Sequence, residues 1–148
     1  MIDVEFDAEA LQDALLDQAN ILRRALAERV QQKLSDEVLH VRSGALAGSI
    51  LSSIENDESD LSVSIGSTGL SYAAIQEFGG KTAAHNIIAV NTKALAFITG
   101  GHKVFAKRVH HPGSSIPARS YLGSSLAEMR DEIKSGFKQI IIEALGQE

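Results

Sequence analysis

The sequence predicts an α+β protein, in which a long N-terminal helix and a C-terminal helix pack on an antiparallel sheet of four or five strands, with a long basic loop. Three observations lead to this prediction. Apolar residues recur every three or four positions near both ends of the chain, as in amphipathic helices. Short apolar runs separated by turn residues fill the middle, as in strands. Both prolines and six basic residues lie in a fifty-residue segment, 78–127, that has no Asp or Glu.

The first helix is expected to begin at Ala8, because Asp7 suits the N-cap, and Phe6 and Leu11 are spaced for a hydrophobic staple. No glycine or proline interrupts the apolar pattern before about Leu39. Its apolar positions are Leu11, Leu15, Ala19, Leu22, Leu26, Val30, Leu34 and Val38. About thirty residues span about 45 Å, whereas a compact chain of this length is about 40 Å across. We therefore expect the helix to kink, protrude or pack on a neighbour. Because the spacing drifts from a strict heptad, a coiled-coil dimer and packing on the chain's own sheet both remain open.

Small residues from 43 to 50 break the helical pattern, and two strands are expected after them. They cover 50–54 and 61–65 and flank the polar run from Glu55 to Asp60. The second strand alternates strictly between apolar and polar residues. This pattern predicts a hairpin with one solvent-exposed face.

The next segment predicts a short helix and further strands. The helix covers 71–78, is closed by Gly79 and Gly80, and carries three apolar residues on one face. These residues are Tyr72, Ile75 and Phe78. The strands are expected at 87–90, at 94–98 and, after Gly100 and Gly101, at 104–105.

The end of the chain predicts an extended segment that leads into the last helix. Pro112 and Gly113 suit the central positions of a type II turn. Ser125 and Glu128 match a capping box at the start of the helix. An apolar stripe then runs to the end, through Leu122, Leu126, Met129, Ile133, Phe137, Ile140 and Ala144. We find no linker that divides the chain, so residues 1–148 are expected to form one domain.

Composition is that of an ordinary globular protein, with 44% hydrophobic and 22% charged residues. The charge is divided unevenly, because the acid-free segment carries a formal +6 and the other 98 residues carry −11. There is no cysteine, so disulfides and thiolate metal sites are excluded. No apolar run approaches the roughly 18 residues of a membrane span, and we expect no membrane contact.

The sequence offers weak grounds for catalysis. His102, His110 and His111 could supply imidazole ligands, but no Asp, Glu or Cys lies near them to complete a metal site. Ser114 and Ser115 lie beside a histidine without a Gly-x-Ser-x-Gly elbow, and the glycine pairs do not form a phosphate loop. We therefore expect no enzyme and no cofactor, and no metal site.

The basic segment is the stronger candidate for function. Its cations are Lys81, Lys93, Lys103, Lys107, Arg108 and Arg119. They could contact the acidic remainder of another copy in a head-to-tail ring, or face a channel. The alternative is a nucleic-acid-binding module that uses segment 81–119 to neutralise phosphates. We favour the ring contact.

Three groups of residues resemble the phage virion morphogenesis family. The groups lie at 43–50, at 72–79 and at 109–123, and the resemblance spans residues 43 to 145. The positions that carry it are Gly44, Leu46, Tyr72, Glu77, Phe78, Gly79, His111, Pro112, Gly113, Pro117, Arg119 and Leu122. Members of this family are tail-completion or neck proteins of tailed bacteriophages and of prophages.

The resemblance implies a structural virion protein in tail completion or head–tail joining, with no catalytic role. It implies a homo-oligomeric ring, expected as a hexamer, through which the genome passes. The implied partners are other phage neck, connector or tail proteins, with non-specific contact to packaged DNA as a further implication. The implied location is the tail or neck of the virion, and the bacterial host cytoplasm during assembly.

Overall fold

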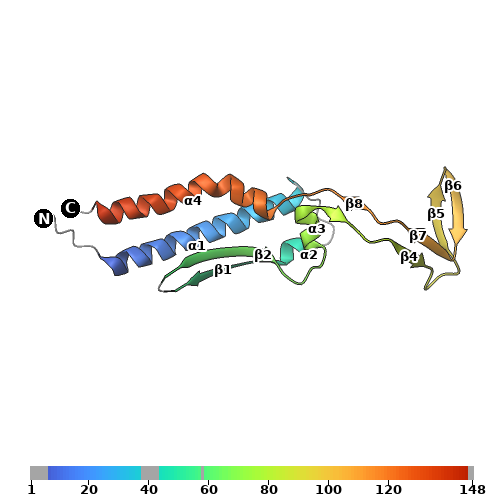
Figure 1. Ribbon diagram of the computed structural model, residues 1–148, viewed down its shortest axis with the longest axis horizontal. Helices are drawn as coiled ribbons and strands as arrows, with labels where there is room; N and C mark the ends of the chain where they lie inside the picture. The colour runs from blue at the N-terminus through green and yellow to red at the C-terminus, as the bar shows by residue number, and fades with distance from the viewer. Residues whose placement is uncertain (1–6, 38–43, 58, 147–148) are drawn as a thin grey trace.

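The protein is described from a computed structural model, in which residues 7–37, 44–57 and 59–146 are placed. These residues form an elongated molecule with two parts (Figure 1). The body contains the described residues up to 78 and from 120 onward, and the arm contains residues 79–119. The body comprises α1 (Ala8–Gln32), the π-helical turn η1 (Lys33–Glu37), α2 (Ala45–Gly48), β1 (Ile50–Asn56), β2 (Leu61–Ser67), α3 (Ala73–Phe78) and α4 (Leu122–Leu145). The arm comprises β3 (Gly80–Lys81), β4 (His85–Ile88), β5 (Leu95–Thr99), β6 (His102–Ala106), β7 (Arg108–His111) and β8 (Ser115–Ile116).

The predicted α+β class and both long helices are confirmed. Helix α1 begins after Asp7, whose carboxylate accepts a hydrogen bond from the Ala10 N–H at 3.0 Å, as the N-cap prediction requires. The helix continues as η1. The predicted staple through Phe6 and the predicted end near Leu39 lie outside the described residues.

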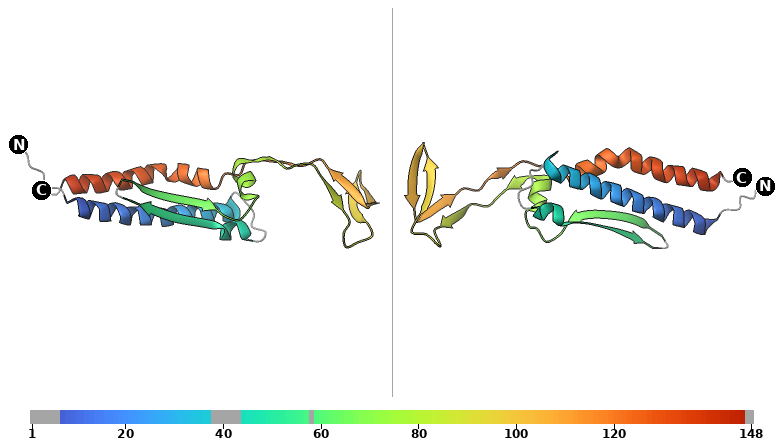
Figure 2. Two further views of the ribbon diagram at one scale, coloured as in Figure 1. Left: turned by 60° about the horizontal axis from the view of Figure 1, so that its bottom comes forward. Right: turned by 180° about the vertical axis from the view of Figure 1, so that it is seen from behind.

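The body has three layers, with α1 in the middle. Helix α4 runs antiparallel to α1 on one side, and the β1–β2 hairpin covers another side (Figures 1 and 2). The buried residues of α1, Ala19, Leu22, Leu26 and Val30, share one face. Val30, Leu34 and Tyr121 form a cluster on which Leu46 and Leu122 pack. The buried core therefore runs along α1 from Ala19 to this cluster, which lies at the end of the body from which the arm leaves.

The predicted hairpin is confirmed, and each strand is two residues longer than expected. Its register runs from Ile50 opposite Ser67 to Asn56 opposite Leu61. At the turn, the Asp57 carboxylate accepts hydrogen bonds from the N–H groups of Ser59 and Asp60, each at 2.8 Å. These bonds, chiefly that from Ser59, lower the pKa of Asp57.

The strands form four two-stranded antiparallel ladders in the described part of the chain, where the sequence predicted one sheet. The β3–β8 and β4–β7 ladders keep a common register, so they make one long ribbon. The β5–β6 hairpin lies at its far end, and both turn residues, Gly100 and Gly101, have the positive φ that a two-residue hairpin turn uses. The segment predicted as a long basic loop is therefore a ribbon.

Pro112 and Gly113 do not form the predicted type II turn. The chain runs straight on from β7 into β8, and both strands pair with the same opposite segment. Gly113 has φ +88, and a Cβ at this position would collide with the carbonyl oxygen of Thr82. The glycine thus permits a close approach of the two chains where the ladder is interrupted.

The predicted capping box at Ser125 is also wrong. Helix α4 begins one turn earlier, at Leu122. Ser125 is buried within the helix, and its hydroxyl donates to the Tyr121 carbonyl at 2.6 Å. Glu128 instead binds α1 and η1, because its carboxylate accepts a hydrogen bond from the Arg29 Nε of α1 at 2.8 Å and from the Lys33 ammonium of η1 at 2.6 Å. A carboxylate from another element caps α4.

Candidate assembly site

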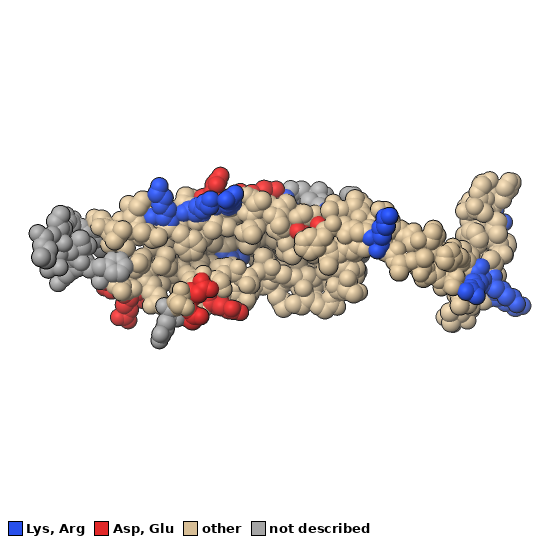
Figure 3. Space-filling model, viewed as in Figure 1, with Lys and Arg blue, Asp and Glu red and all other residues tan. Residues whose placement is uncertain are grey.

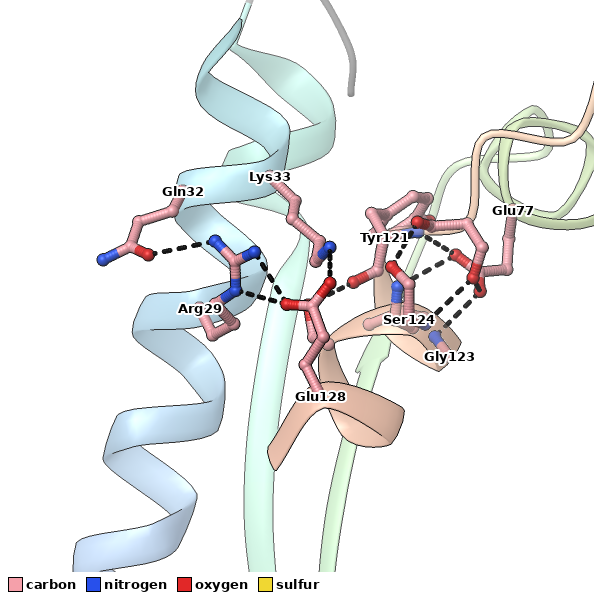
Figure 4. A network of polar contacts seen from close by, with 11 residues as sticks. Arg29, Gln32, Lys33, Glu77, Tyr121, Gly123, Ser124 and Glu128 are labelled. Atoms are coloured by element: carbon pink, nitrogen blue, oxygen red, sulfur yellow. Dashed lines mark hydrogen bonds and ion pairs between the residues drawn. The ribbon is translucent and has the colours of Figure 1, made fainter. Parts of the chain in front are cut away.

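Glu77 is the carboxylate that caps α4. It lies in the last turn of α3 and is 5% exposed. Its two oxygens face the first turn of α4 (Figure 4). They accept hydrogen bonds from the N–H groups of Tyr121 (2.7 Å), Leu122 (2.9 Å) and Gly123 (2.9 Å) and from the Ser120 hydroxyl (2.6 Å). One side chain thus satisfies three N–H groups at the helix start, which otherwise lack partners within the helix.

This site stabilises the ionised form of the Glu77 carboxyl group. Burial by itself raises the pKa of its carboxyl group, but the hydrogen bonds from Ser120 and the helix N–H groups outweigh burial and lower the pKa. The positive end of the α4 dipole favours the same ionised state. Burial, followed by the charge of Glu77, raises the pKa of Tyr121, whose hydroxyl donates to the Ala73 carbonyl at 3.4 Å.

The root of the arm is built directly on this cap. Gly79 has φ +71, and a Cβ there would lie 2.6 Å from the Ala118 nitrogen and 2.9 Å from the Ile116 oxygen. The Arg119 N–H donates to the Gln76 carbonyl at 2.8 Å. The outgoing and returning strands therefore leave the body as a tight pair.

The structure brings together some of the twelve positions that carry the resemblance and leaves the others apart. Glu77, Phe78, Gly79, Pro117, Arg119 and Leu122 are at or next to the arm root. His111, Pro112 and Gly113 lie farther along, where the ribbon is interrupted. Leu46 packs on the core cluster, Gly44 (φ +70) precedes α2, and Tyr72 precedes α3.

All six candidate cations lie on the arm and are exposed. Lys81 and Arg119 lie near the root, whereas Lys103, Lys107 and Arg108 lie on or between β6 and β7. Lys93 lies in the segment between β4 and β5. They do not form one compact cluster, and Figure 3 shows blue side chains at both the root and the far end of the arm. The arm therefore carries cations at its root and toward its far end, with no acid to offset them.

Two of the arm's histidines stack across the ribbon. His85 and His111 are opposite each other, and their rings stack with centroids 5.1 Å apart. The Gly113 N–H donates to His111 Nδ1 at 3.1 Å, and His110 contacts Asn86 Oδ1 at 3.3 Å. Among the described residues no three His, Cys, Asp or Glu side chains gather as metal ligands.

The sequence did not predict that the side chains of the arm are so exposed to solvent. The structure describes every residue from 79 to 120, and none of them is buried. Several large apolar side chains are open to solvent, among them Val90 (86% exposed), Ile98 (76%) and Phe105 (65%). Alternating strand patterns predict one covered face, but they do not say whether the cover comes from the same chain. The described part of the chain thus leaves these apolar side chains uncovered.

Ile98 and Phe105 share one face of the β5–β6 hairpin with a cation. Ile98 is opposite Lys103, and Phe105 is opposite Ala96, so these four side chains point to the same side. The Lys103 ammonium lies 5.5 Å from the centre of the Phe105 ring. The tip of the arm therefore presents apolar surface beside positive charge.

Comparison of the chain with protein-family models, with curated protein sequences and with solved structures finds no match. No helix in the described ranges is both long and apolar enough to cross a bilayer.

Proposed function

We propose that this protein is a structural subunit that assembles with further copies of itself through its arm. The observation that carries the proposal is the arm itself, forty-one residues in which no side chain is buried and no carboxylate occurs. Because the Ile98 and Phe105 side chains are exposed to solvent, the hydrophobic effect within this chain stabilises the arm little. A protein surface that covers them supplies the missing burial.

The exposed area of the whole chain supports assembly. It exposes 10903 Å², whereas a compact monomer of 15.8 kDa exposes about 7300 Å². The excess, about 3600 Å², is of the size that obligate protein–protein interfaces bury. A subunit that contacts a neighbour on each side, as in a ring, covers such an area.

We further propose that the assembly is a ring, expected as a hexamer, that acts in tail completion or head–tail joining of a tailed bacteriophage or prophage. This part rests on the resemblance to the phage virion morphogenesis family. The position of Glu77, Gly79 and Arg119 at the arm root supports it, because motif residues that anchor an arm suit a protein that works by assembly. The proposed partners are neck, connector and tail proteins, and the proposed role is non-enzymatic, without a cofactor. The proposed location is the virion, after assembly in the bacterial cytoplasm.

A nucleic-acid-binding module remains the second candidate, favoured by six exposed cations and no acid on the arm. The apolar side chains weigh against it, because phosphates and sugars offer Ile98 no comparable apolar surface. The two functions respond to different substitutions.

The test uses sedimentation of the full chain across a wide concentration range. We expect the wild type to form rings visible by electron microscopy, and Ile98→Ser with Phe105→Ser to remain monomeric. Lys107→Glu with Arg108→Glu tests the second candidate, since DNA retention at low salt that these changes abolish would support nucleic-acid binding. A wild-type chain that stays monomeric at high concentration, alone and with its tail-tube or connector partners, would overturn the proposal.

A further inference from the structure

One face of α1 is open to solvent and acidic. Its exposed positions are spaced by three or four residues and lie opposite the buried face of the helix. We call this set the α1 face, and it consists of Asp13, Asp17, Ile21, Arg24 and Glu28. Ile21 is 59% exposed at its centre, and the charged residues give the face a net −2. Neither α4 nor the hairpin covers it.

One exposed side of α4 carries the opposite charge, whereas the exposed Glu128, Glu132 and Glu143 lie on another side of the helix. We call the first side the α4 face, and it consists of the exposed residues Leu126, Ala127, Arg130, Asp131, Lys134, Lys138 and Ile141. Its charged residues give a net +2. An open groove with a largely apolar lining runs beside Leu126 and Ile133 and is bordered by Arg130 and Lys134. Figure 3 shows lysine and arginine side chains along the top of the body, over α4, with acidic side chains beside them.

The charges on both faces have no partner among the residues that the structure describes. In the described part of the molecule, no ion pair or side-chain hydrogen bond involves Asp13, Asp17, Lys134 or Lys138. The two helices are also matched in length, with 25 and 24 residues. Two copies of one face would repel each other, whereas an α1 face and an α4 face attract.

We propose that the α1 face of one copy packs against the α4 face of the next copy. Ile21 would then enter the apolar groove beside Leu126, with acids of one copy opposite lysines and arginines of the other. The contact joins two different surfaces, so it is heterologous, and repetition closes a ring if the rotation permits. The inference rests on the proposed self-assembly and adds a contact between bodies that is separate from the arm.

The test uses two charge-reversed variants of the full chain. Asp13→Lys with Asp17→Lys makes both faces basic, and Lys134→Glu with Lys138→Glu makes both faces acidic. Each variant alone should show at least a tenfold higher dissociation constant for self-association by sedimentation. An equimolar mixture should assemble again, because every contact then joins opposite charges. Glu55→Lys with Asp60→Lys is the matched control, since it changes the net charge of the chain as much as the first variant but lies off both faces.

The mixture also guards against misfolding, because a variant that fails to fold cannot restore assembly. If a charge-reversed variant does not fold, two neutral variants replace the pair, Asp13→Asn with Asp17→Asn and Lys134→Gln with Lys138→Gln. Each neutral variant should weaken self-association and reduce its dependence on salt concentration. Variants that assemble like the wild type would overturn the body contact. If the charge-reversed variants assemble like the wild type but the arm variant Ile98→Ser with Phe105→Ser is monomeric, the proposed self-assembly through the arm stands and the contact between bodies is wrong. A monomeric wild type would overturn both.

Discussion

The carboxylate of Glu77 accepts a hydrogen bond of 2.7 Å from the backbone N–H of Tyr121, although the two residues are 44 positions apart in the chain. Between them lies the whole arm. The bond joins the end of α3, from which the arm leaves, to the start of α4, to which it returns. Glu77 therefore caps a helix and closes the base of the arm with the same two oxygen atoms.

Replacing Glu77 should destabilise the body strongly. Glu77→Ala removes four hydrogen bonds and leaves backbone N–H groups without acceptors, and we expect a loss of about 3 kcal/mol in the free energy of unfolding. Ser120→Ala removes one of these bonds, together with the bond that the Ser120 hydroxyl accepts from the Ser124 N–H, and should cost about 1 kcal/mol. Urea denaturation of the three proteins measures both. Equal losses for the two variants would contradict the role of Glu77 as the shared acceptor.

The stability that Glu77 contributes should depend on pH in a defined direction. Its pKa in the folded state lies below the ordinary value of 4.5, so the contribution is complete above about pH 4.5 and is lost as the pH falls through the lower folded pKa. The difference in unfolding free energy between the wild type and Glu77→Gln should thus be largest at neutral pH and should shrink in acid. Denaturation at a series of pH values from 7 to 3 checks this, and a difference that grows in acid would refute it.

Gly79 should be far less tolerant of a side chain than Gly100. Both have positive φ, but a Cβ at Gly79 meets the backbone of Ala118, whereas at Gly100 it meets nothing within 4 Å. Gly100→Ala should cost about 1 kcal/mol through its backbone conformation alone. Gly79→Ala adds a clash with the returning strand and should cost at least about 2 kcal/mol. Thermal unfolding compares them, and similar losses would argue against tight pairing at the root.

Trypsin should cut the free subunit first in the arm, within 99–115. Lys103, Lys107 and Arg108 are exposed on strands without a buried side chain, whereas Lys33 in the body is 4% exposed. In the assembled protein the same sites should be cut more slowly, because the arm is then covered. Mass spectrometry of the first fragments identifies the sites. Complete protection of the arm in the monomer, or first cleavage at Lys33, would count against this prediction.

Much of the candidate site could be predicted from local patterns. The N-cap at Asp7, the two long helices, the hairpin and the acid-free segment are all read from neighbouring residues, and the structure contains them. The predicted apolar stripe of α4 is wrong at Leu126, which is 51% exposed. The capping box at Ser125 failed because its local signal competes with Glu77, which reaches the helix from another element. The predicted turn at Pro112 is wrong because Gly113 packs closely against Thr82 on the opposite strand, so the chain continues as a ribbon.

The sequence by itself thus determined the helices, the hairpin and the uneven charge, because periodicity, capping and composition act over a few residues. Only the tertiary structure decided that the acid-free segment leaves the body as a ribbon and that Glu77 closes its base. Those features depend on pairing between distant segments, such as Gly80 with Ile116, and register is set by which surfaces meet in space. The exposure of Ile98 and Phe105 was also decided by the tertiary structure. The alternation of apolar and polar residues along a strand is the same whether its apolar face packs on the chain's own core or on a neighbouring molecule.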